Sequence, residues 1–192
     1  MRHIGIILTL LTLLTVSCNS QTHNDFDKKA IALNNKAIEI MHSDPDSALR
    51  LLDKATNIDK NYYVAYNNKM SIYCSRGEYE NAIKAAEQGL KVKPDLAESV
   101  TMLGMLYDYT GQPDKAKEHY QKAIDLYDNR IATSDKYKQA NRLNRAHALL
   151  LVGKATEGQK EVRELLKENP DDFTIQMLVD FDKNKYLNDL FE

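Results

Sequence analysis

Cysteine and histidine are the side chains of this protein with the widest chemical range, and the chain has few of them. Its 192 residues include two cysteines, Cys18 and Cys74. The histidines are spread along the whole chain, as His3, His23, His42, His119 and His147. None lies in a His-Glu-x-x-His motif, and no cysteine cluster has the spacing of a zinc site. We therefore expect no metal centre, no cofactor and no catalytic activity; His147, the one histidine placed to face the interior, is expected to be a packed residue.

Cys18 stands at the end of a segment that is typical of protein export. A short basic start is followed by an apolar run of thirteen residues, Ile4 to Val16. A bilayer-spanning helix needs about 20 residues, whereas an export signal needs only a short apolar run. The sequence Leu14-Thr15-Val16-Ser17-Cys18 resembles a bacterial lipoprotein signal, in which a small residue precedes the cysteine that is lipidated. The residue three before the cysteine is usually aliphatic in that family, and here it is Thr15.

This resemblance implies three consequences for the chain. Residues 1–17 would be a signal peptide, and residues 18–25 a lipidated Cys18 with a polar tether. The acyl anchor would attach the protein to a membrane. The expected localisation is the bacterial cell envelope, at the outer membrane and facing the periplasm. An ordinary signal peptide cut at another site is the alternative. With Cys18 acylated, Cys74 has no disulfide partner, so we expect a small buried side chain; a reactive thiol would need an electropositive neighbour.

Composition favours a folded protein that does not bind nucleic acid. The 26 basic and 28 acidic side chains give a net charge of −2. Proteins that bind nucleic acids usually have an excess of basic residues, which this chain lacks. Hydrophobic residues make up 43% and charged residues 28%, as in globular domains. Four prolines and seven glycines are too few for a β-sandwich, because that fold requires frequent turns.

Residues of one type recur 34 positions apart. The recurrences include Ala48, Ala82 and Ala116, Tyr73 and Tyr107, and Gly77 and Gly111. This pattern resembles the tetratricopeptide repeat (TPR), a helix pair of 34 residues. The best unit begins at Ala97 and has the Leu103-Gly104 pair of that family. The resemblance implies an all-α fold, a right-handed superhelical stack of antiparallel helix pairs (a TPR-like α-solenoid) with a C-terminal capping helix.

The repeats divide the body of the chain, residues 26–192, into units. They cover about 29–62, 63–96, 97–138 and 139–172, and capping helices cover 173–192. Small residues such as Gly104 let paired helices approach, and Gly77 and Gly111 suit the turn after the first helix. Eight extra residues between Leu126 and Asn141 predict two lengthened helices that meet near residues 133–135. In the fourth unit, a shift of one residue turns Leu143 inward instead of Arg142.

The concave groove of a TPR array is the candidate binding site. By resemblance, the first helices of units two and three line it with Asn67, Ser71, Met105, Asp108 and Tyr109. The matching positions lack the basic residues of a carboxylate clamp. We therefore expect an unidentified protein or peptide as partner, an envelope protein that this chain serves as a scaffold or assembly factor. Two alternatives remain: a small-ligand or peptide carrier with a pocket between groove and C-terminal helix, and a groove filled by the chain's own tail.

Overall fold

The computed structural model describes residues 26–192. The predicted signal peptide, the polar tether and Cys18 lie outside this part of the chain. The described residues form ten helices and no strand, which confirms the all-α prediction. The helices are α2 (Lys28–Ile40), α3 (Pro45–Ile58), α4 (Tyr63–Ser75), α5 (Tyr79–Val92), α6 (Ala97–Tyr109), α7 (Pro113–Thr133), α8 (Lys138–Leu151), α9 (Ala155–Glu168), α10 (Phe173–Gln176) and α11 (Lys183–Phe191). Contacts divide the chain into two compact units, one running to Pro94 with Phe191–Glu192, the other Asp95–Leu190.

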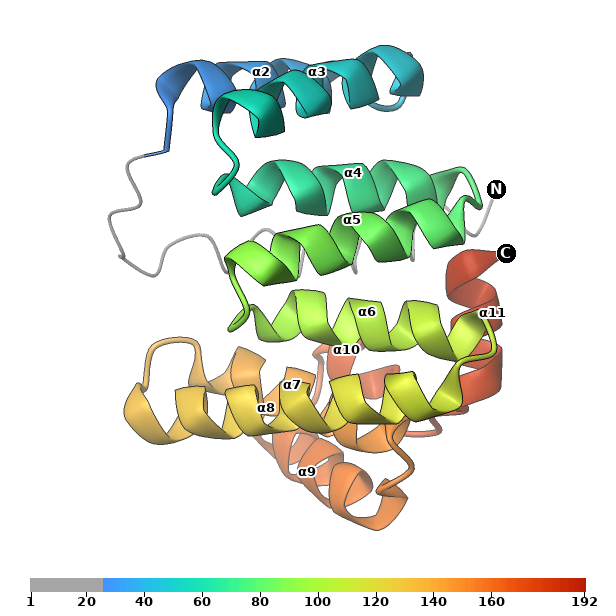
Figure 1. The fold of residues 1–192 in the computed structure, drawn as a ribbon. Coiled ribbons are helices and arrows are strands. Elements are labelled where there is room, and N and C mark those ends of the chain that lie inside the picture. Colours follow the sequence, from blue (N-terminus) through green and yellow to red (C-terminus); the bar gives the residue numbers. More distant parts are fainter. Residues whose placement is uncertain (1–25) are drawn as a thin grey trace. The chain divides into compact units, whose positions relative to one another are not determined.

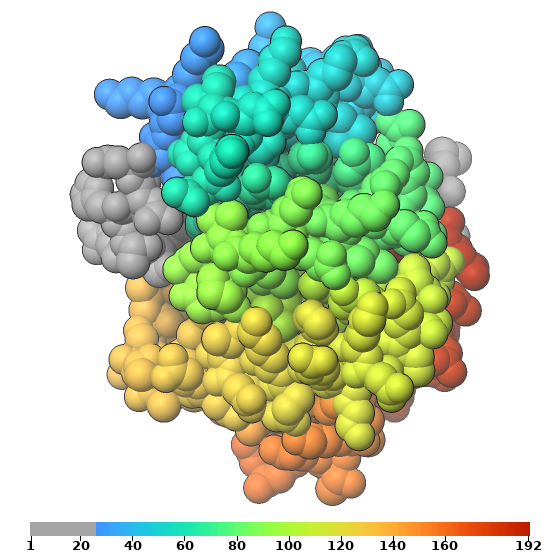
Figure 2. All heavy atoms as spheres, in the orientation of Figure 1, coloured from blue at the N-terminus to red at the C-terminus, as the bar shows by residue number. Residues whose placement is uncertain are grey.

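The first unit consists of two helix pairs. Short turns join α2 to α3 and α4 to α5, and the members of each pair lie side by side (Figure 1). Helix α3 also packs on α4. In the space-filling view, the atoms of α4 and α5 lie directly against one another (Figure 2). The core contains the larger side chains of Leu52, Tyr62 and Ile72 and five alanines, which allow the close approach of neighbouring helices: Ala30, Ala37, Ala48, Ala55 and Ala65.

A hydrogen bond in this unit joins equivalent positions of consecutive repeats. The Asn68 side-chain amide donates to the Asn34 side-chain oxygen over 2.7 Å, and the two residues are 34 positions apart. Asn34 is buried, and a buried amide without a partner would cost about 1–3 kcal/mol. The repeat period thus places two polar side chains where each satisfies the other.

The turn after the first helix of a pair has the same geometry in three repeats. Gly77, Gly111 and Gly153 have positive φ values of 69°, 76° and 88°. The amide of the residue after each glycine bonds a carbonyl five residues back, for example from Glu78 to Tyr73 over 2.9 Å. This is the Schellman motif, in which glycine adopts the left-handed conformation at little cost.

The second unit begins with α6, which buries ten of its thirteen residues. Gly104 lies where α6 meets α7. A Cβ atom at this position would stand 2.7 Å from Cε1 of the buried Tyr120 ring. Only a residue without a side chain fits that contact.

The predicted lengthening after Leu126 is present in only one of the two helices. Helix α7 has 21 residues, whereas α8 has 14, close to the 13 of α4 and α6. The prediction of two lengthened helices is therefore wrong for α8. The chain turns back at residues 134–137, where Tyr137 has a left-handed φ of 60°.

Helix α8 adopts the shifted register. Leu143, Ala146 and Leu150 are buried, and Arg142 and Arg145 point to the carboxylates of neighbouring helices. Arg142 pairs with three glutamates of α9, and Arg145 with residues of both α7 and α9. The partners are Glu161 at 2.6 Å, Glu168 at 2.9 Å and Glu164 at 3.8 Å for Arg142, and Asp128, Glu157 and Glu161 for Arg145.

The C-terminal segment covers the α8–α9 pair. Ile175 and Leu178 are buried in one cluster with Leu143, Val162 and Leu165. The segment contains two helices. The first, α10, has four residues, and the second, α11, has nine. The segment thereby shields apolar side chains that the last helix pair would otherwise expose.

Candidate functional site

The predicted groove residues lie on the first helices of two repeats. Asn67 and Ser71 are half-buried on one face of α4, in the first unit. Met105, Asp108 and Tyr109 lie on α6 in the second unit. Met105 is only 2% exposed and belongs to the core, whereas Asp108 and Tyr109 are half-buried near the end of α6.

Asp108 is bound by the chain's own C-terminal helix. The ammonium group of Lys183, the first residue of α11, lies 2.9 Å from Oδ2 of Asp108. The Tyr120 hydroxyl donates to the same oxygen over 3.3 Å. The Asp108 side chain is 12% exposed and that of Lys183 is 38% exposed. The predicted groove residue Asp108 therefore pairs with a lysine of the chain itself.

Aromatic contacts fix the start of the same C-terminal helix. The His147 ring of α8 lies 4.9 Å from the Tyr186 ring and 5.5 Å from the Phe181 ring, measured between centroids, both edge-on. Phe181 and Tyr186 also contact each other, at 5.2 Å. Burial raises the pKa of Tyr120, with smaller contributions from Asp108 and Tyr186. Asp108 and the His147 ring thus contact the first turns of α11.

Two polar atoms in the aromatic cluster lack a hydrogen-bond partner within the described chain. They are Nε2 of His147 and the hydroxyl oxygen of Tyr186, and both are inaccessible to solvent. Burial lowers the pKa of His147 to about 4 and raises the pKa of Tyr186. Each unsatisfied atom costs about 1–3 kcal/mol relative to a hydrated one.

A second acidic side chain on α6 is also neutralised internally. The Arg130 Nη1 atom donates to Oε1 of Glu98 over 2.6 Å, and the Arg130 Nη2 atom donates to the Asp95 carbonyl over 3.0 Å. The extension of α7 carries Arg130, so the longer helix provides the cation. Both carboxylates of the α6 face, Glu98 and Asp108, are therefore bound by bases of the second unit.

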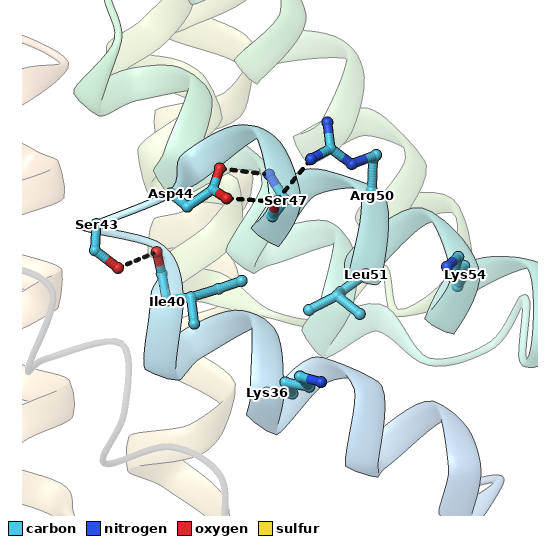
Figure 3. Close-up of a pocket in the computed structure, with 8 residues that line it drawn as sticks. All are labelled: Lys36, Ile40, Ser43, Asp44, Ser47, Arg50, Leu51 and Lys54. Atoms are coloured by element: carbon cyan, nitrogen blue, oxygen red, sulfur yellow. Dashed lines mark hydrogen bonds between the residues drawn. The ribbon is translucent and has the colours of Figure 1, made fainter.

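A hollow of about 390 Å³ lies between α2 and α3 of the first unit (Figure 3). Ile40 and Leu51 supply apolar surface, and Lys36, Arg50 and Lys54 supply positive charge. The Arg50 guanidinium donates to the Ser47 hydroxyl over 2.7 Å. Lys36 and Lys54 form no ion pair with residues 26–192. Asp44 lines the same hollow, which therefore combines apolar surface with side chains of both charges.

Cys74 has the environment of a structural thiol. Burial raises its pKa to about 12, so the thiolate that would react is scarce at neutral pH. No group of histidine, cysteine, aspartate or glutamate in residues 26–192 is arranged to hold a metal ion. Among the same residues, no helix combines the length and the hydropathy needed to cross a bilayer.

Sequence reasoning missed Lys183 as the partner of the groove residue Asp108, and the contact of His147 with Tyr186. Lys183 and Asp108 are 75 positions apart, and the tail that carries Lys183 lies outside the repeat pattern. A periodic pattern can locate residues only within its own frame. The apolar spacing of the tail indicated a closing helix, but it contained no information on which face of the array that helix contacts.

Comparison with known proteins identifies the repeat. Residues 61–129 match the family described as Tetratricopeptide repeat. Heat shock protein STI1 of Saccharomyces cerevisiae is 27% identical over 104 residues, which are 54% of this chain and 18% of that protein. The Small glutamine-rich tetratricopeptide repeat-containing protein 2 of the same yeast is 27% identical over 92 residues, 48% of this chain and 26% of that protein. The chain spans less than a third of the length of these relatives.

Solved structures share the fold at low sequence identity. A thermophilic TPR protein of Thermus thermophilus is 17% identical, with a TM-score of 0.56 over 100% of this chain and 92% of that one. YrrB, described as a TPR protein with an unusual peptide-binding site, is 20% identical, with a TM-score of 0.55 over 87% and 86%. These similarities confirm the TPR-like α-solenoid class. Residues 61–129 match the tetratricopeptide repeat, and the described residues share the fold of solved TPR proteins.

Proposed function

We propose that this chain is a non-catalytic protein-interaction scaffold, anchored to the bacterial envelope by a lipidated Cys18 at the outer membrane and facing the periplasm. The lipoprotein-like sequence before Cys18 supports the anchor. The repeat fold supports the scaffold role, because TPR helix pairs present extended surfaces to other proteins. The partner is an envelope protein that meets the array near the membrane.

One observation carries the interaction role: groove side chains of α6 and α7 already hold a helical segment. Asp108 of α6 binds Lys183 of α11, and the Tyr120 hydroxyl of α7 donates to the same carboxylate. A surface that binds one helix through a carboxylate and aromatic rings can bind another of the same chemistry. The peptide-binding site named for YrrB supports the same kind of use for this fold.

The carrier role is the second candidate function. A pocket between the groove and the C-terminal helix needs that helix to lie at the α6 face, and the Lys183–Asp108 pair places it there. The unsatisfied Nε2 of His147 and the hydroxyl of Tyr186 could then bind a small polar ligand. Native mass spectrometry of the purified protein distinguishes the two roles, because a carrier retains a small molecule of defined mass.

Co-purification tests the scaffold role. The tagged full chain is extracted from membranes with detergent, isolated and analysed by mass spectrometry. We expect one protein to be recovered in stoichiometric amount. If the chain is recovered without another protein after in-cell cross-linking, and with a bound small molecule, the carrier role would replace the scaffold role as the proposed function.

A further inference from the structure

The position of Lys183 at Asp108 is that of a bound ligand side chain. The Asp108 carboxylate is 12% exposed and accepts from two groups, the Lys183 ammonium and the Tyr120 hydroxyl. Lys183 keeps 38% of its side chain exposed. A carboxylate that is more buried than its cation resembles a receptor site more than a surface ion pair.

Within the second unit, the described polar contact of α11 is the Lys183–Asp108 ion pair, beside the ring contacts of Tyr186. The helix has nine residues, and isolated helices shorter than about 12–15 residues are marginal in water. Its docking leaves Nε2 of His147 and the hydroxyl of Tyr186 without hydrogen bonds inside the described chain. Both atoms would regain water on release of the helix, which offsets part of the apolar contact that is lost.

The apolar side of α11 defines what the site accepts. Leu187 is 4% exposed, and the Tyr186 ring packs on His147. Together with Lys183 they form a motif: a basic residue, an aromatic residue three positions later and an aliphatic residue four positions later. Residues at this spacing share one helix face.

We propose that α11 is a resident ligand of the α6–α7–α8 face, and that the partner is a helical segment with the same motif, which displaces it. This inference rests on the proposed scaffold function and specifies its partner. The partner presents a lysine or arginine to Asp108 and apolar side chains to His147. An acidic segment is disfavoured, because its carboxylate would meet that of Asp108.

The test uses a fluorescent peptide of residues 181–192 added to the full chain. In the wild type, the tethered copy competes at an effective concentration of the order of millimolar, so the peptide binds weakly. The variant Lys183→Glu with Leu187→Ser frees the site, and we expect its peptide affinity to rise at least tenfold. Adding Asp108→Asn to this opened variant should reverse the gain at least tenfold.

Matched controls separate the site from general charge and stability effects. Lys185 and Asn188 are exposed on the same helix, so Lys185→Glu with Asn188→Ser should bind like the wild type. Asp114 is exposed at the start of α7, and Asp114→Asn in the opened variant should leave the affinity unchanged. If circular dichroism shows that the opened variant is unfolded, Lys183→Glu alone replaces it.

Equal peptide affinity in the wild type and the opened variant would overturn the resident-ligand proposal, as would binding that survives Asp108→Asn. This failure is distinguishable from that of the scaffold role. A stoichiometric partner recovered from membranes together with a negative peptide test would refute only the resident ligand. If the peptide test is positive but no protein partner is recovered, α11 would act as an intramolecular ligand only, and the scaffold role would be refuted.

Discussion

Gly104 shows how one residue limits the distance between two helices. A Cβ here would lie 2.7 Å from Cε1 and 2.8 Å from Cδ1 of Tyr120, and this tyrosine is only 1% exposed. We expect Gly104→Ala to lower the free energy of unfolding by about 1–3 kcal/mol through overpacking, and Gly104→Leu by at least as much. Urea denaturation measures the effect.

The helix preference of the new residue acts in the opposite direction. Alanine in place of glycine at a solvent-exposed helix position gains about 1 kcal/mol. A double variant with Tyr120→Leu relieves the clash, so it should be more stable than the sum of the two single changes predicts. A rise in stability for Gly104→Ala alone would mean that the helices are farther apart than described.

At the scale of elements, the arginine pair of α8 connects three helices. The Arg142 side chain is 21% exposed and that of its partner Glu161 is 18% exposed. Hydrogen bonds that Arg142 donates to Glu168 and Glu161 raise the pKa of Arg142. Arg142→Ala leaves these carboxylates close together, so we expect a loss of about 1–2 kcal/mol in the free energy of unfolding. Thermal melts at low and high salt measure it.

Arg163 is the matched control, because it lies exposed on α9 and belongs to no described ion pair of the network. Arg163→Ala should change the stability by less than about 0.5 kcal/mol. Equal effects of Arg142→Ala and Arg163→Ala would show that the network does not hold α8 against α9.

The docking of the C-terminal segment should depend on pH through His147. Burial lowers its pKa to about 4, whereas a hydrated histidine has a pKa near 6.5. The docked segment therefore has its full stability above about pH 6.5 and loses it as the pH falls towards 4. Hydrogen exchange should show less protection of residues 181–190 at pH 5 than at pH 7.

The imidazole faces the Tyr186 and Phe181 rings, so neutral leucine can replace it. His147→Leu should abolish the difference in protection between pH 5 and pH 7. His42 is exposed in the turn after α2, and His42→Leu should leave the difference unchanged. Retention of the full pH effect in His147→Leu would assign it to another group.

At the scale of the molecule, the attachment to a membrane depends on one side chain. Cys18→Ala should convert the protein from membrane-bound to soluble, because stable anchoring needs acyl chains and no described helix can cross a bilayer. Fractionation of washed membranes measures this. Wild-type and variant protein that pellet equally would refute the lipoprotein hypothesis.

The sequence predicted the repeated part of the fold and not the contacts of its ends. The 34-residue period places small residues such as Gly104 at helix contacts and Gly111 in a turn, because the same helix pair and turn recur in each repeat. The length of α8 was mispredicted, since eight extra residues can enter either helix or the turn between them. The pairing of Lys183 with Asp108 depends on a non-repeating tail whose direction no periodicity determines.

Titration of the purified partner against the wild type and Tyr109→Ala tests the central claim most directly. Tyr109 is half-buried beside Asp108, and tyrosine contributes large contact area with little loss of entropy. We expect Tyr109→Ala to weaken binding by about 2 kcal/mol or more and to leave the thermal melt unchanged. Equal affinities, with binding lost instead when residues 128–138 at the end of α7 are changed, would contradict the groove as the partner site.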